Sequence, residues 1–233
     1  MRNLFIKINK LFTVTEISFF LILSLLACPA IVLSEEIQPV DNVIEKLQRS
    51  YDQIKDLRAD FIQETTIRAM KKTQRESGEV FFKNPKNMLW KYLKPEGKKL
   101  IISSRKAWLY LPQEKVVYVQ KSDSIFQSKF LINFFSGSGK LKDDFIIQFS
   151  QPNALDQHGN YQLVLSPKQK TAACNSIQLT VDKDQFYISR LSFDDAMGNS
   201  TSLQFSNIRR NKGLTEKLFQ FKPPVGVQVL EVP

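Results

Sequence analysis

The stretch from Gly78 to Pro112 contains three or four short apolar runs of strand length, separated by residues that favour turns. Within it, Met88, Trp90 and Tyr92 alternate with other residues, so an extended chain places these three side chains on one face of a sheet. Prolines, glycine and asparagine punctuate the runs, as they do between strands. The pattern predicts meandering antiparallel strands whose large apolar side chains need cover from the rest of the chain.

Strand-like runs also lie on both sides of this stretch, and we count ten or eleven strands with two or three helices. A strand is expected over 57–66, then a polar turn at 71–75, then a strand that starts at Gly78. Residues 39–56 and 123–135 carry apolar side chains at helical spacing. Parallel βαβ alternation is absent, so the sequence predicts a large antiparallel sheet, closed as a barrel or half-closed, with helices inside its concave face.

The first 34 residues have the pattern of a signal peptide, which leaves a single domain over residues 35–233. Three basic residues precede an uncharged apolar run at 17–27 that is too short to span a bilayer. Cleavage is expected before Glu35. The alternative is that the segment ending in Cys28 is a lipobox, in which case that cysteine is lipidated. Both alternatives predict an exported protein.

The net charge of +10 admits three kinds of partner, namely nucleic acid, an anionic membrane surface or an acidic protein. The sequence has no recognition-helix motif, RNA-binding signature or dense Lys/Arg tract, so a nucleic-acid partner is not expected. A solvated basic surface without a partner is the alternative.

The sequence contains few residues in catalytic arrangements, and we expect neither an enzyme nor a bound cofactor or metal. His158 is the single histidine and lies in a polar turn, while zinc sites need several His or Cys ligands. The adjacent acids Asp143–Asp144 and Asp194–Asp195 suit glycosidase chemistry only if their carboxyl groups are held at the required distance across a cleft. An exported hydrolase that uses these acids is therefore the weakest of the functions considered.

Four segments together resemble the periplasmic outer-membrane lipoprotein carrier family, LolA. They are the helix and first strand from Leu47 to Gln63, the segment GEVFFKNPKNMLW from Gly78, the strand WLYLP from Trp108, and FQFKPPVGVQV from Phe219. Their order and spacing hold from about residue 39 to the end of the chain. The resemblance implies an incomplete β-barrel with helices as a lid. It also implies a monomeric periplasmic carrier that takes acylated lipoproteins from an inner-membrane ABC transporter to an outer-membrane acceptor, often LolB.

Under this interpretation, the apolar residues divide into a cavity wall and a lid. The predicted lipid-binding wall consists of Phe61, Phe82, Met88, Trp90, Tyr92, Trp108 and Tyr110. The predicted lid consists of Val43, Leu47 and Ile54 in the first helix, with Phe126, Phe130 and Phe134 in the second.

One position departs from the family pattern. Asn84 stands where the family often has an arginine that ties the lid shut through backbone carbonyls. An asparagine can donate a neutral hydrogen bond but lacks the charged, forked geometry of arginine, so we expect a looser closed state. A carrier of another lipid or glycolipid on the same scaffold is the main alternative function.

Overall fold

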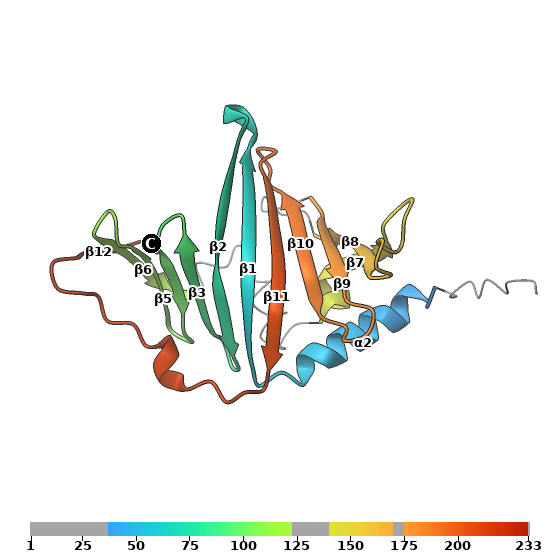
Figure 1. The fold of residues 1–233 in the computed structure, drawn as a ribbon, viewed down its shortest axis with the longest axis horizontal. Coiled ribbons are helices and arrows are strands. Elements are labelled where there is room, and N and C mark those ends of the chain that lie inside the picture. The colour runs from blue at the N-terminus through green and yellow to red at the C-terminus, as the bar shows by residue number, and fades with distance from the viewer. Residues whose placement is uncertain (1–36, 123–139, 170–174, 233) are drawn as a thin grey trace, which may run out of the picture. The chain divides into compact units, whose positions relative to one another are not determined.

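A computed structural model describes residues 37–122, 140–169 and 175–232, and the chain from Gln38 onward forms one unit. Most of this unit is a single sheet of twelve strands (Figure 1). The strands are β1 (Asp56–Ile67), β2 (Lys72–Lys83), β3 (Asn87–Lys94), β4 (Lys99–Ile102), β5 (Lys106–Leu111), β6 (Val116–Lys121), β7 (Phe145–Phe149), β8 (Tyr161–Pro167), β9 (Ile177–Val181), β10 (Ile188–Asp194), β11 (Ser200–Arg210) and β12 (Gln228–Glu231). The helical elements are α2 (Val40–Asp52), η1 (Arg68–Met70), α5 (Leu141–Asp144) and η2 (Glu216–Phe219).

The sheet is open, which confirms the expectation of an incomplete barrel. Its strand order is β12-β6-β5-β4-β3-β2-β1-β11-β10-β9-β8-β7, so that β12 and β7 are its two edges. Neighbouring strands are antiparallel except for β12, which pairs in parallel with β6. The described chain has twelve strands rather than ten or eleven, because the C-terminal segment adds this edge strand.

The hairpin of β1 and β2 is longer than the sequence predicts. Pairing runs from Asp56 opposite Lys83 to Ile67 opposite Lys72, so the expected polar turn at 71–75 is wrong. The turn lies at η1, and Lys71 closes it with a φ of 49°. The polar residues belong to the strand because they find partners across it, as Arg75 does with Glu64 at 2.6 Å.

The first helix packs its apolar side as expected. Val43, Ile44, Leu47 and Tyr51 are buried in α2, while polar residues fill most of the other side. The helix ends at Asp52 rather than at residue 56, where β1 begins.

The two faces of the sheet bury different groups of side chains, which we call the inner and outer faces. The inner face carries the main core, to which α2, β1, β2, β3 and β7 to β11 all contribute buried side chains, such as Val43, Phe61 and Phe82. The outer face of β2, β3 and β4 carries a second cluster of Phe81, Leu89 and Ile101. Phe219 of η2 completes that cluster, so the C-terminal segment covers this part of the outer face.

Candidate functional site

A cluster of aromatic rings lies on the inner face where β1, β2, β3 and β11 run side by side. The Phe61 ring lies 4.8 Å from Trp90 and 5.0 Å from Tyr92, both in edge-to-face orientation. Trp90 also faces Phe82 and Phe205, with centroids 6.4 and 6.2 Å apart. Phe61, Phe82 and Phe205 are buried, whereas Trp90 and Tyr92 are only half-buried. We call these five rings, with Met88, the aromatic wall.

Gly78 explains how rings from β1 and β3 can meet although β2 runs between them. Its Cα is paired with Phe61 on one side and with Tyr92 on the other. A Cβ at this position would lie 2.1 Å from the carbonyl oxygen of Lys91, so the register shift beside Gly78 brings the two backbones too close for any side chain. The missing side chain therefore leaves the space over which Phe61 and Tyr92 touch.

The polar atoms of the wall are satisfied locally. The Tyr92 hydroxyl donates to Oε1 of Gln63 at 3.0 Å, and Trp90 Nε1 lies 2.9 Å from the sulfur of Met88. Burial, with a smaller effect of Glu76, raises the pKa of Tyr92 above its ordinary value, so this phenol stays neutral. Among the described residues, no buried side-chain nitrogen or oxygen lacks a partner. The wall thus presents an apolar surface.

Helix α2 is attached to the same inner face near the start of β10. The Tyr51 hydroxyl accepts a hydrogen bond from the Ile188 backbone N–H at 3.1 Å, and burial raises the pKa of this tyrosine. The Ser50 hydroxyl donates to the Gln185 carbonyl at 3.2 Å. Predicted lid residues Val43, Leu47 and Ile54 are buried in the same core as the aromatic wall.

Asn84 bonds to the backbone that links α2 to β1. Its side-chain amide donates to the carbonyl of Ile54, a predicted lid residue, and its backbone N–H donates to the Lys55 carbonyl at 2.9 Å. The position that departs from the family pattern therefore makes one neutral side-chain bond, in the place where a latch is expected.

The placement of Trp108 and Tyr110 with the wall is wrong. The register pairs Trp108 with Ile101, which puts both side chains on the outer face. The rings of Trp108 and Tyr110 both face Phe221 of the C-terminal segment, at centroid distances of 6.3 and 5.7 Å. The predicted face of β5 is reversed because the turn between β4 and β5 determines which β5 side chains point to the inner face.

The other predicted wall residues, Phe61, Phe82, Met88, Trp90 and Tyr92, do come together. The predicted lid residues Phe126, Phe130 and Phe134 lie outside the described residues, as does Cys28. Sequence reasoning missed Phe205, although its alternation with Leu203 in an apolar-polar strand was a usable signal. It also read Gly78 only as the start of a strand.

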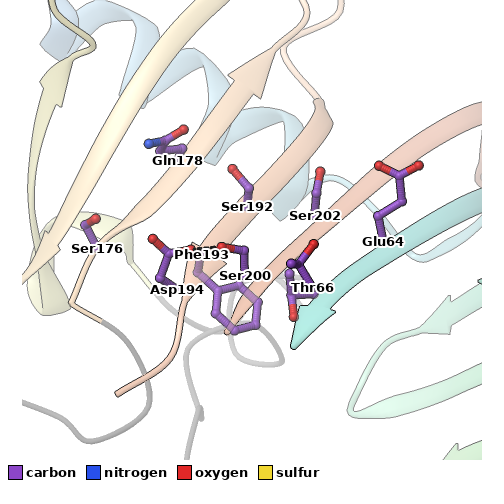
Figure 2. A pocket seen from close by; sticks show the side chains of 10 residues that line it. Glu64, Thr66, Ser176, Gln178, Ser192, Phe193, Asp194, Ser200 and Ser202 are labelled. Atoms are coloured by element: carbon purple, nitrogen blue, oxygen red, sulfur yellow. Dashed lines mark hydrogen bonds between the residues drawn. The ribbon is translucent and has the colours of Figure 1, made fainter. Parts of the chain in front are cut away.

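The outer face of β9, β10, β11 and β1 is polar and has a shallow hollow of about 250 Å³ (Figure 2). The Ser200 hydroxyl donates to Asp194 there at 2.5 Å. Asp195 instead closes the turn before β11, where it accepts from the Asn199 side chain and from the backbone N–H groups of Met197 and Asn199. These bonds lower the pKa of Asp195, so this acid has a structural role in the turn.

The described part of the chain has no group of three or more His, Cys, Asp or Glu side chains placed to hold a metal ion. None of its helices is long and apolar enough to cross a membrane.

The sequence comparisons agree on one family, and a structural comparison gives the same fold. The sequence profile described as "Outer membrane lipoprotein carrier protein LolA" matches residues 52–222. Outer-membrane lipoprotein carrier proteins of Methylococcus capsulatus and Dechloromonas aromatica are 27% and 24% identical over 187 residues, which cover 80% of this chain and 86% of each relative. An uncharacterized conserved protein from Thermus thermophilus has the same fold, with a TM-score of 0.54 at 15% identity over 84% of this chain and 100% of that one.

Proposed function

Since the chain belongs to the LolA family of outer membrane lipoprotein carrier proteins, we propose that it carries acylated lipoproteins through the periplasm. The observation that carries this proposal is the aromatic wall, in which Trp90 and Tyr92 stay half-buried beside buried apolar side chains of the main core. Partly covered aromatic rings without unsatisfied polar atoms suit acyl chains, which offer no hydrogen bonds. The role is that of a carrier, without a catalytic step.

The energetics of a lipid anchor require such a surface. Burial is worth about 0.8 kcal/mol per CH₂, so one ~16-carbon chain represents about 12 kcal/mol in water. A free lipoprotein therefore stays in its membrane, and a carrier must offer an equivalent apolar surface. The cargo must also leave again, so the carrier needs something that competes with it.

We assign this competing role to helix α2, as the lid. Its buried Val43, Ile44 and Leu47, with the following Ile54, represent roughly 6–12 kcal/mol of apolar burial at 1.5–3 kcal/mol per side chain. This range is similar to the value for one acyl chain. Exchange of the helix for an acyl chain is then nearly balanced, which favours both loading and release.

The proposed transport path starts at an inner-membrane ABC transporter that releases lipoproteins and ends at an outer-membrane acceptor of the LolB kind. We propose a monomer, exported by residues 1–34 and released before Glu35. An anchor on Cys28 is the alternative, and mass spectrometry of the mature N-terminus distinguishes the two. Another lipid or glycolipid on the same wall is the second candidate for the cargo, because the rings do not select a headgroup.

The test is native mass spectrometry, with lipid extraction, of the full chain expressed with its leader and purified from the periplasm. We expect a co-purifying acylated lipoprotein. Met88→Glu and Trp90→Glu should each lower its occupancy about tenfold or more, because a carboxylate in the wall must be desolvated when the acyl chain binds.

Gln204→Glu is the matched control, since it adds the same charge to an exposed position on the other face of β11. It should leave cargo occupancy unchanged. Normal loading of a folded Trp90→Glu protein would rule out the aromatic wall as the site. A phospholipid in place of a lipoprotein would favour the second candidate.

A further inference from the structure

The positive charge of the described chain is concentrated in one part of the sheet. Residues 72–122, which form β2 to β6, contain twelve basic and four acidic residues, a net charge of +8. All other described residues together contain sixteen basic and fifteen acidic residues, a net charge of +1. The basic character is therefore a local property of β2 to β6 and not a general feature of the surface.

Four of these basic residues line up along one end of the sheet, and we call them the basic row. Lys86 lies in the turn between β2 and β3, Arg105 in the turn between β4 and β5, Lys106 begins β5, and Lys121 ends β6. All four are exposed, and none forms an ion pair with another described residue. With strands about 4.8 Å apart, the row extends over roughly 15–20 Å.

Two features of the basic row stand out: two of its charges repel each other, and the backbone that carries them is held in place by hydrogen bonds. Lys106 and Lys121 are directly paired across β5 and β6, where like charges destabilise a sheet. The backbone around them is nevertheless fixed. The buried Ser122 donates from its hydroxyl to the Ser104 carbonyl at 3.1 Å and from its N–H to the Arg105 carbonyl at 3.1 Å.

We propose that the basic row docks the protein on the phosphate groups of anionic phospholipids at a bilayer surface. Three of the four residues are lysines, which are depleted in protein–protein interfaces, where arginine is enriched. Basic residues near a membrane surface are attracted to anionic lipids by about 1 kcal/mol each, so four of them together provide a substantial attraction. An extended plane of phosphates also suits a straight row better than a single small anion does.

This inference goes beyond the proposed transport, because it concerns the surface of the protein without cargo. It is tested by co-sedimentation of the purified full chain with phosphatidylcholine vesicles, with and without phosphatidylglycerol. We expect binding only to the anionic vesicles, and its loss at high salt, where charges are screened over shorter distances. The variant with Lys86→Gln, Arg105→Gln, Lys106→Gln and Lys121→Gln should bind about 10- to 1000-fold more weakly.

The matched control removes four exposed basic residues elsewhere, by Lys71→Gln, Lys72→Gln, Lys94→Gln and Lys115→Gln. It should retain most of the binding, although its net charge equals that of the row variant. Equal losses in both variants would overturn the proposal, because they would mean that only total charge matters. Wild-type protein that binds a soluble acidic protein but not the anionic vesicles would also overturn it.

Two readouts keep these outcomes interpretable. The row variant should unfold at the same or a slightly higher temperature than the wild type, because the Lys106–Lys121 repulsion is gone. Its cargo occupancy, measured by native mass spectrometry, tests the aromatic wall separately, since no residue of the row belongs to the wall. Loss of vesicle binding with normal cargo occupancy would show a defect in docking alone. Normal vesicle binding with loss of cargo would show a defect in cargo binding alone.

Discussion

Trp90 and Trp108 lie on opposite faces of the same sheet, and their surroundings differ in one respect. Trp90, on the inner face, contacts three phenylalanines of the wall and remains half-buried. Trp108, on the outer face, is also half-buried, but it faces Phe221 and joins the cluster around Phe219, both of which belong to the C-terminal segment. The outer cluster is covered by the chain itself, through residues that follow β11. We therefore expect the outer cluster of β2, β3 and β4 to behave as permanent core, and the aromatic wall to be the part of the sheet where exchange with cargo takes place.

The largest expected effect is on the covered outer face. Phe219→Ala removes a ring that is 3% exposed and packs against Phe81, Leu89 and Ile101. We expect the free energy of unfolding to fall by about 3–5 kcal/mol, as for other buried aromatic truncations. Chemical denaturation measures this loss.

Cargo occupancy per folded molecule of Phe219→Ala should stay normal, because Phe219 does not touch the wall. If the variant instead loses cargo while its stability is unchanged, the division between permanent core and exchangeable face is wrong.

On the inner face, Gly78→Ala should reduce stability less than Phe219→Ala does, but it should also reduce cargo occupancy. The added methyl group meets the Lys91 carbonyl and must separate β2 from β3, which costs about 1–3 kcal/mol. The separation also moves Tyr92 away from Phe61, so cargo occupancy should fall. Native mass spectrometry and thermal unfolding give the two values.

Gly97→Ala is the control for a glycine in the same part of the chain, since nothing lies within 4 Å of the position of its Cβ. It should change neither stability nor cargo. Normal loading by Gly78→Ala would mean that the contact between rings over Gly78 is not needed for binding.

The comparison also explains how far sequence reasoning reaches. Alternation within one strand is a local property, so the shared face of Met88, Trp90 and Tyr92 was predictable. The face of Trp108 was not, because both faces of β2 to β4 are apolar. Adjacent pairs such as Phe81–Phe82 and Ile101–Ile102 show no contrast between inside and outside.

Long-range pairing was the second limit. Phe205 joins the wall only because β11 pairs with β1, with Phe205 opposite Phe61, although the two strands are far apart in sequence. The polar residues of β2 were predicted as a turn because polarity alone does not reveal partners such as Glu64 for Arg75. The incomplete barrel was predicted from the family resemblance. The burial of one side of α2 was predicted from the helical spacing of its apolar residues.

The smallest expected effects come from two asparagines on either side of the turn between β2 and β3. Asn84 donates to the Ile54 carbonyl on the inner side, whereas the Asn87 side chain donates to Glu216 of η2, at 3.2 Å, on the outer side. Asn84→Ala should lower the free energy of unfolding by about 1 kcal/mol, and Asn87→Ala by less, since its bond is exposed.

Hydrogen exchange resolves where each change acts. Asn84→Ala should speed amide exchange in the C-terminal turn of α2, because the connection that holds the helix to β1 loses its side-chain bond. Asn87→Ala should speed exchange only in η2. If α2 is a lid, Asn84→Ala should also shorten the time for cargo loading while Asn87→Ala leaves it unchanged. Faster exchange in α2 without faster loading would mean that the helix is a fixed cover, and that acyl chains reach the wall without moving it.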